Sequence, residues 1–543
     1  MRQPQRQNAE RRAALNWLVL LAGLALLLAP GWGAWERASA QDRLTPQESR
    51  GKQIYVRGTS PSGDEVLAYL GESSLEVPGS AVACANCHGL DGQGRPEGGV
   101  NPSNLSWEVL TKPYGQTHAD GRKHPPYSER ALELAITRGT DPAGNKLLSV
   151  MPRYVMSRED MADLIFYLQH LGEDRDPGIS KNEIVIGTAV PAEGAMADVG
   201  QAVKAVITAF FDEINSQGGI YSRHLELKCI ETAETPAATR VNLERLLRDE
   251  QVFAMMSVFI AGSEKEVLPL LAQQDVPLIG PLTLYPQIGF PLNREVFYLL
   301  SGTDGLARAL IDFASKKPEF ENLGVTIVYP TSEINAGVVE AIRDQRQKHG
   351  LSAPRMYDYV AGRFDAARAI KQLGRSSRDA LFFLGNSEEA LSFMRAADQL
   401  GWFPSIFLPG PGGGTEIFYA PPGFNGKLFF SFPTSPADQS AEGINEFGAL
   451  AEKYKLPSHH LATQMLAYSA AKILVEGLKR AGRDVSRDKL IQSLEGIYEY
   501  PTGLTPALTF GPNRRIGAMG AYVVTIDLNE KQFLPASGWI NIN

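Results

Sequence analysis

Two of the chain's three cysteines lie close to a histidine. Cys84, Cys87 and His88 form the sequence C-x-x-C-H, in a chain of 543 residues that has only 3 Cys and 8 His. Two thiols three positions apart can each form a thioether with one vinyl group of a porphyrin, and the adjacent histidine can then bind the iron. The spacing therefore predicts one covalently attached haem c, with His88 as an axial ligand. A zinc site is the alternative, but it would need a second ligand pair at similar spacing, which the sequence lacks.

The sixth ligand of such an iron should be a methionine sulfur or an imidazole nitrogen. Met151, which precedes Pro152, lies in a predicted loop, and Met156, five residues later, is its main competitor. His118 and His124 are weaker candidates, because they lie in a polar, proline-rich segment where we expect both to be solvated. A methionine that fills a gap in the core is the simpler interpretation of Met151, so residue type alone leaves the choice open.

Three amphipathic helices are predicted around these residues. They begin after Thr45, Ser128 and Ser157, since Ser and Thr favour helix N-termini. Small or apolar residues recur at helical spacing within them: Gly51, Ile54 and Tyr55; Leu132, Ala135 and Ile136; Met161, Leu164, Ile165 and Leu168. We expect these helices to pack around the C-x-x-C-H segment as a small all-α domain.

Residues 44–172 resemble a class I cytochrome c domain. Four motifs carry the resemblance in the family's order: Gly51-x-x-Ile54-Tyr55, Cys84 to His88, Met151-Pro152 and Tyr167-Leu168. The resemblance implies electron transfer as the activity and Met151 as the sixth iron ligand. Two segments depart from the family pattern, an insert at residues 57–82 and a long loop rich in Gly and Pro at residues 93–127. Such loops often shape a partner surface.

The first 40 residues have the pattern of an export signal. Four arginines lie within the first 12 residues, an apolar run extends from Ala13 to about Ala29, and Ala38-Ser39-Ala40 offers a cleavage site. We therefore expect a cleaved signal peptide at residues 1–40. The apolar run approaches the ~20 residues that span a bilayer, so an uncleaved membrane anchor is the alternative. Both outcomes leave the rest of the chain in the periplasm.

Residues 173–182 are polar, contain Pro177 and Gly178, and are expected to link two domains. After them, short apolar runs alternate with helical patterns. The predicted strands are residues 184–187, 225–230, 253–259, 276–279, 325–329, 381–384, 406–408 and 428–432. This alternation predicts a doubly wound α/β architecture in two lobes, with a ligand crevice at the carboxyl ends of the strands.

The second region resembles the type I periplasmic binding proteins of the leucine/isoleucine/valine-binding group. The resemblance rests on Ile184 to Pro191, on Asp212 to Asn215 followed by Gly218-Gly219-Ile220, and on Val276 to Pro281. It implies a two-lobed module at residues 183–540 that closes over a small-molecule solute, and delivery to an ABC permease or a sensor role. Lobe I is expected at about 183–302 with part of 433–508. Lobe II is expected at about 303–432 with the C-terminal strands.

The same resemblance suggests which residues line the solute pocket. Ser263 lies in the loop that would hold a solute carboxylate, and Thr283 lies in a second carboxylate-binding turn. Asp304 lies near the family's acidic partner for an amine, and Asn386 stands where an aromatic residue is common. The turn at Gly410 lacks the family's second acid. Because a buried ammonium needs paired carboxylates, we expect a solute that is less charged than an α-amino acid, or differently shaped.

Composition and motifs exclude several functions. The formal net charge is −8, so the basic surface that nucleic acid requires is missing. The sequence has no His-Glu-x-x-His, no Gly-x-Ser-x-Gly and no Gly-rich phosphate loop with Lys, so it gives no sign of a catalyst. Cys229 alternates with apolar neighbours in a predicted strand and is expected to be a buried, inert thiol.

We therefore expect a periplasmic c-type cytochrome in which haem electron transfer accompanies, or is coupled to, binding of a small molecule, and which exchanges electrons with a redox partner protein. The first alternative is the receptor of an ABC importer with an accessory cytochrome domain. The second is a subunit of a haem-dependent oxidoreductase, although an iron with two protein ligands leaves no open position for a substrate.

Overall fold

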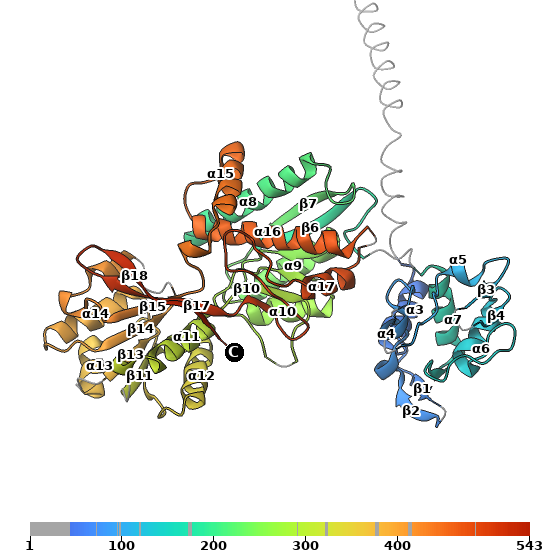
Figure 1. Ribbon diagram of the computed structural model, residues 1–543, viewed down its shortest axis with the longest axis horizontal. Coiled ribbons are helices and arrows are strands. Elements are labelled where there is room, and N and C mark those ends of the chain that lie inside the picture. Colours follow the sequence, from blue (N-terminus) through green and yellow to red (C-terminus); the bar gives the residue numbers. More distant parts are fainter. Residues whose placement is uncertain are drawn as a thin grey trace, which may run out of the picture. The chain divides into compact units, whose positions relative to one another are not determined.

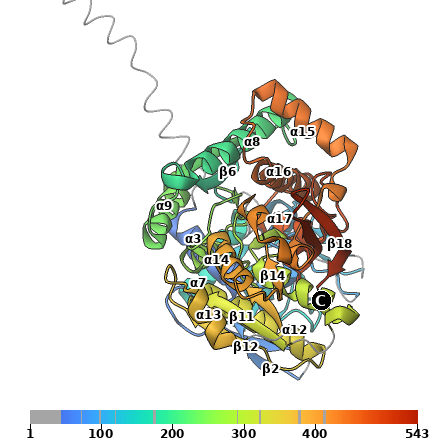
Figure 2. The same cartoon turned by 90° about the vertical axis from the view of Figure 1, so that its left-hand side faces the viewer.

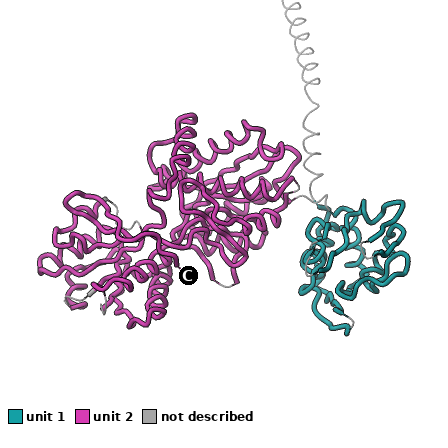
Figure 3. Tube along the Cα trace, in the orientation of Figure 1, with its two compact units in different colours: residues 1–175 teal, residues 176–543 magenta. Residues whose placement is uncertain are grey.

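The computed structural model describes residues 44–542 except 72, 95, 97–98, 119–120, 172–175, 290, 321–323, 375–378, 411–414 and 484. The chain divides after Arg175 into two compact units, called unit 1 and unit 2 below (Figure 3). The predicted signal or anchor at residues 1–40 lies outside the described residues. Within the described part of the chain, none of the helices is both long enough and apolar enough to cross a bilayer.

The described part of unit 1 contains the three α-helices predicted from sequence and two further short ones. They are α3 (Pro46–Arg57), α4 (Cys84–His88), α5 (Trp107–Leu110), α6 (Glu129–Arg138) and α7 (Arg158–Gln169). Thr45, Ser128 and Ser157 cap α3, α6 and α7 as predicted, each by accepting a hydrogen bond from a backbone N–H of the first turn. The predicted apolar faces are buried in one core.

Helices α3 and α7 pack closely because α3 has a glycine at their contact. A Cβ on Gly51 would lie 2.1 Å from the carbonyl oxygen of Asp163, so no other residue fits there. The Arg50 guanidinium donates to the Asp163 carboxylate at 2.6 Å across the same contact. The Tyr55 hydroxyl donates to the carbonyl of Gly89 at 2.7 Å. The helix pair therefore holds the chain directly after the C-x-x-C-H segment.

Unit 1 also contains strands that the all-α prediction missed. Strands β1 (Leu67–Leu70), β2 (Leu75–Pro78) and β5 (Arg153–Val155) form an antiparallel sheet in the order β2-β1-β5, and β3 (Gln116–Thr117) pairs with β4 (Lys123–His124). The insert at residues 57–82 thus forms a hairpin, in which Leu70 lies opposite Leu75. Pairing β1 with β5 satisfies backbone groups that a long insert would otherwise leave unpaired.

Unit 2 begins with lobe I, which is built on a six-stranded parallel sheet in the order β16-β10-β9-β8-β6-β7. Its strands are β6 (Glu183–Val190), β7 (His224–Glu231), β8 (Ala254–Met256), β9 (Leu278–Ile279), β10 (Val296–Leu300) and β16 (Ile516–Ala518). Its helices are α8 (Ala197–Ser216), α9 (Pro236–Asp249), α10 (Glu264–Gln273), α15 (Ala441–Tyr454), α16 (Leu461–Ala481) and α17 (Arg487–Glu495). Helices α8 and α16 contact each other on one face of the sheet, and α9 and α10 cover the other (Figure 1 and Figure 2).

Lobe II is built on a seven-stranded sheet in the order β12-β11-β13-β14-β15-β17-β18. Its strands are β11 (Gly324–Pro330), β12 (Arg355–Tyr359), β13 (Asp379–Phe383), β14 (Ser405–Pro409), β15 (Leu428–Phe432), β17 (Gly520–Asp527) and β18 (Gln532–Asn541). The first five strands are parallel, whereas β17 and β18 are antiparallel to their neighbours. Helices α11 (Thr303–Ser315) and α12 (Glu333–Lys348) cover one face, and α13 (Ala366–Leu373) and α14 (Ser387–Asp398) cover the other.

The chain passes between the two sheets of unit 2 three times, at residues 301–303, 433–440 and 519. Short 3-10 helices complete the chain: η1 (Gly79–Val82), η2 (Gly194–Met196), η3 (Pro318–Phe320), η4 (Thr415–Tyr419), η5 (Pro422–Phe424) and η6 (Pro436–Asp438). Residues 176–182, expected to be linker, pack on unit 2. Ile179 is buried in its core, and the carboxylate of Asp176 accepts from the backbone N–H of Arg487 at 2.5 Å. The connection between the units is therefore shorter than residues 173–182.

Candidate functional site

Both thiols of the C-x-x-C-H segment lie on the short helix α4. Cys84 and Cys87 are not part of a disulfide, and Cys87 is exposed whereas Cys84 is half-buried. Burial raises the pKa of Cys84 to about 11, although a hydrogen bond with Tyr154 opposes the shift. Two reduced thiols one helical turn apart are what a double thioether link requires.

His88 is buried and has one nitrogen engaged. Its Nδ1 lies 2.9 Å from the carbonyl oxygen of Ser103. A carbonyl can only accept, so Nδ1 carries the proton and Nε2 keeps its lone pair. Nε2 forms no hydrogen bond with any described residue. Burial lowers the pKa of His88, which favours the neutral ring that a metal ion binds.

These residues fit a haem c. Nε2 of the buried His88 has no partner among the residues that the structure describes, and two free thiols lie on the same short helix. Cys84 and Cys87 would hold the porphyrin, and His88 would bind its iron through Nε2. When bound, the haem supplies one-electron transfer at its iron. The Ser103 carbonyl would fix the orientation of the His88 ring, as hydrogen-bond partners of metal-binding histidines do.

Met151 and Met156 differ in their surroundings. Both are half-buried, but Met156 packs against the core of unit 1, whereas Met151 lies in the loop before β5 and is not among the residues of that core. Met156 thus contributes to the packing of unit 1. Tyr154 lies between them in sequence, is buried, and donates from its hydroxyl to the carbonyl of Val82. That contact ties the Met151 segment to the chain just before Cys84.

The Met151 loop is held by a guanidinium that the sequence analysis missed. Arg153 donates to the carbonyls of Leu147 and Leu148, both at 3.2 Å, and to that of Met151. It packs against Gly139, where a Cβ would lie 1.9 Å from the guanidinium nitrogen Nε. Arg153 forms no ion pair with a described residue. No sequence pattern predicts that Arg153 holds this loop, because its acceptors are backbone carbonyls.

The two histidines of the long loop are not both solvated, so that prediction is wrong for His124. His124 is buried, with its Nδ1 2.7 Å from the Pro125 carbonyl and its Nε2 2.9 Å from Nε2 of His118. Both of its nitrogens are therefore engaged within the loop. In the described part of the chain, no three His, Cys, Asp or Glu side chains gather to hold a metal ion.

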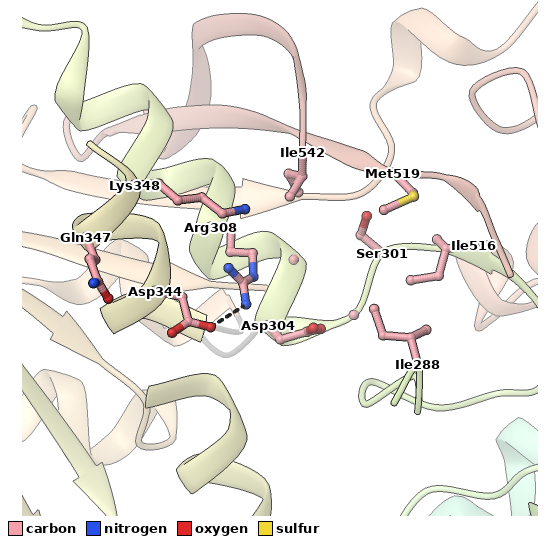
Figure 4. Close-up of a pocket in the computed structure, with 12 residues that line it drawn as sticks. Ile288, Ser301, Asp304, Arg308, Asp344, Gln347, Lys348, Ile516, Met519 and Ile542 are labelled. Carbon is pink, nitrogen blue, oxygen red and sulfur yellow. Dashed lines mark hydrogen bonds and ion pairs between the residues drawn. The ribbon is translucent and has the colours of Figure 1, made fainter. Parts of the chain in front are cut away.

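A cavity of about 580 Å³ lies in unit 2 where the chain crosses between the lobes. Ser301 and Gly302 of the first crossing and Met519 of the third line it (Figure 4). Charged side chains of α11 and α12 form one wall, and aliphatic side chains form the other: Asp304, Arg308, Asp344 and Lys348 against Ile288, Ile516, Met519 and Ile542. The cavity therefore offers both polar and apolar contacts.

Among the described residues of this cavity, Arg308 makes only long contacts. Arg308 lies 3.4 Å from the Asp344 carboxylate and 3.4 Å from the Gln345 side-chain oxygen. Burial raises the pKa of Asp304, and the nearby positive charge of Arg308 opposes the shift. Long contacts of this kind leave donors of Arg308 available to a bound molecule.

The family model for "Periplasmic binding protein" matches residues 183–532, most of unit 2. The chain belongs to the periplasmic binding protein family. A second family model, "Cytochrome c", matches residues 79–172. The chain thus joins a cytochrome c domain to a periplasmic binding protein of type I.

Curated relatives of this periplasmic binding protein include the Leu/Ile/Val-binding protein BraC3 of Rhizobium johnstonii, 23% identical over 59% of this chain and 86% of the relative. The leucine-, isoleucine-, valine-, threonine- and alanine-binding protein of Pseudomonas aeruginosa is 22% identical over 60% of this chain and 86% of its own length. A branched-chain amino acid ABC transporter protein of Thermus thermophilus with bound valine has a similar fold, with a TM-score of 0.54 at 16% identity over 67% of this chain and 98% of that one. A fatty acid ABC transporter substrate-binding protein of Thermomonospora curvata also gives 0.54, at 15% identity over 68% and 95%.

Of the four pocket positions suggested by sequence, Asp304 is the one that the cavity at the crossings includes, and the other three have hydrogen-bond partners within the chain. The Ser263 hydroxyl donates to the Ile260 carbonyl at 3.1 Å, and the Asn386 side chain caps α14 by accepting from Glu389 N–H at 2.9 Å. The Thr283 hydroxyl donates to the carboxylate of Glu264 at 2.6 Å. Glu264 was missed by sequence reasoning, since acidic residues are common in first helical turns.

Cys229, expected to be a buried, inert thiol, lies in β7 and is half-buried. It packs against the core of lobe I, and burial raises the pKa of its thiol. Both features are typical of a structural thiol.

Proposed function

We propose that unit 1 is a periplasmic electron carrier with one haem c on Cys84 and Cys87 and with His88 and Met151 as axial ligands. The observation that carries the proposal is the buried imidazole of His88, whose Nδ1 proton is held by Ser103 while Nε2 has no partner among the described residues. Met151 is preferred to Met156 because Met156 packs against the core of unit 1, whereas Met151 does not. A methionine ligand would raise the reduction potential relative to a second imidazole.

Unit 2 then binds a small solute between its lobes. The cavity at the crossings supports this, because both lobes contribute to its walls and a change in their closure would change its shape. Asp304 lines it, and Thr283 stands at the carboxyl end of β9, where α/β folds bind ligands. Ser263 and Asn386 form hydrogen bonds within the chain, so they would stabilise the walls of the solute site rather than contact the solute.

The two activities share one chain, and we infer that they serve one process: solute binding accompanies electron transfer to a redox partner protein, without catalysis by this chain. A reduced-minus-oxidised visible spectrum of the mature protein tests the electron carrier. The reduction potential, measured with and without the solute that co-purifies, tests coupling. An unchanged potential would contradict coupling, and a high-spin spectrum would contradict two axial ligands.

Delivery of the solute to an ABC permease is the second candidate. It is favoured by the similar proteins, which are named as amino acid-binding proteins or as parts of ABC transporters. Stimulation of a reconstituted permease ATPase by the purified, solute-loaded protein would support this function. If the permease ATPase is not stimulated and the reduction potential changes on solute binding, the redox function is favoured.

A further inference from the structure

One carboxylate is buried in the wall of lobe I that faces lobe II. Glu264 is the first residue of α10 and is only 6% exposed. Helix α10 follows β8, and Thr283 follows β9, so both lie at the carboxyl ends of neighbouring parallel strands. Lys265, the next residue, pairs with Glu333 at the start of α12 in lobe II. This end of α10 therefore lies where lobe I meets lobe II and at the carboxyl ends of the strands, where ligands of α/β folds bind.

Both oxygens of the Glu264 carboxylate are held by donors of the crevice wall. The Gly262 N–H donates to Oε2 at 2.9 Å, and the Thr283 hydroxyl donates to Oε1 at 2.6 Å. Gly262 has φ of 83°, a left-handed conformation that glycine adopts without strain. A backbone N–H, a hydroxyl and the N-terminus of a helix of 10 residues together bind anions well. Here the anion is the chain's own side chain.

No cation neutralises Glu264 within the described chain. The adjacent Lys265 is engaged with Glu333, and Glu264 forms no ion pair with a described residue. Burial raises the pKa of Tyr298 to about 12 and also raises the pKa of Tyr285, and the proximity of Glu264 adds to both shifts. A buried carboxylate without a cation disfavours a second carboxylate beside it and favours a hydrogen-bond donor or a positive group.

We propose that Glu264 fills the anion-binding position of lobe I, so that unit 2 takes a solute that meets this wall with a hydroxyl or an ammonium and without a carboxylate. This inference rests on the proposed solute-binding function and specifies its substrate class. Two acceptor positions of the Glu264 carboxylate remain for such a donor, because only two of about four are used.

The test, anion rescue, asks whether a small carboxylate anion stabilises the Glu264→Ala variant of the full chain, and the readout is the melting temperature. Removing the carboxylate leaves the Gly262 N–H and the Thr283 hydroxyl without an acceptor. Sodium formate or acetate, compared with sodium chloride at equal ionic strength, should raise the melting temperature of the variant by several degrees with saturation. The wild type and the matched control Glu266→Ala should not respond. Adding Thr283→Val to the variant should abolish most of the rescue.

Equal response of Glu264→Ala and the wild type to the carboxylates would overturn the inference. Should Glu264→Ala not fold, refolding it in acetate decides: recovery supports the filled anion site, and equal failure in acetate and chloride contradicts it. Isoamylamine and isocaproate test the substrate class, because they share a 3-methylbutyl group and differ in carrying an ammonium or a carboxylate. Isocaproate should bind only the variant. Its binding to the wild type as tightly as to the variant would contradict the proposal. Anion rescue needs no natural solute, so its failure is distinct from failure of solute binding.

Discussion

The C-x-x-C-H segment of unit 1 and the cavity of unit 2 draw their side chains from the sequence in different ways. In unit 1, two thiols and an imidazole lie within five consecutive residues on α4. In unit 2, the cavity draws side chains from α11, α12 and the segments at residues 288, 516–519 and 542, more than 200 residues apart. Covalent attachment demands fixed local spacing, whereas a noncovalent pocket needs only spatial convergence. The first kind of site is readable from sequence, and the second depends on the fold.

The largest effect should come from the thiols. Cys84→Ala combined with Cys87→Ala should abolish haem that resists acid–acetone extraction, because no thioether can form. Cys229→Ala is the matched control and should retain full haem, since its thiol packs in lobe I. Haem staining after denaturing electrophoresis measures the outcome. If the double variant kept extraction-resistant haem, attachment would not depend on the local pair of thiols. The contrast between a site set by local spacing and a site set by the fold would then fail.

Met151→Ala should come next. Loss of the thioether ligand should lower the reduction potential by on the order of 100 mV, a fraction of the ~0.8 V range that axial ligands span. It should also remove the long-wavelength absorption band of methionine-ligated ferric haem. Met156→Ala should keep the band but lower the free energy of unfolding of unit 1 by about 1–3 kcal/mol, because Met156 packs against the core. The opposite pattern would make Met156 the ligand.

Arg153→Leu should destabilise the same loop. It removes charge-assisted hydrogen bonds to the carbonyls of Leu147, Leu148 and Met151. We expect the free energy of unfolding of unit 1 to fall by about 1.5–3 kcal/mol, measured by denaturant titration. Arg158→Leu, an exposed arginine on α7, should change it by less than about 0.5 kcal/mol. Equal effects of the two variants would mean that Arg153 does not hold the loop.

The smallest effect should be the pH dependence of unit 2. Burial raises the pKa of Asp304, so the folded chain binds this proton more tightly than the unfolded chain. The stability that Asp304 contributes is full below its ordinary pKa of about 3.9 and is lost as the pH rises through its folded pKa. Asp304→Asn should lose this dependence and be the more stable protein at neutral pH. Asp398→Asn, exposed on α14, is the control, and a matching pH profile in both variants would contradict the shift.

Sequence reasoning predicted the local features of both units well. The caps at Thr45, Ser128 and Ser157 and eight strands of unit 2 are confirmed, because capping and short apolar runs are local signals. It missed the sheet of β1, β2 and β5, since β1 and β5 are more than 80 residues apart. It also missed Arg153 and Glu264, whose roles depend on backbone groups brought close by folding. Contacts of that kind leave no pattern in a single sequence.

The intact mass of the mature protein, expressed in a strain competent in cytochrome maturation, tests the central claim most directly. Covalent attachment at Cys84 and Cys87 predicts a chain heavier by one haem, with a tryptic peptide containing both cysteines carrying the added mass. A colourless chain with the mass of the bare polypeptide, and both thiols free to react with iodoacetamide, would contradict the account.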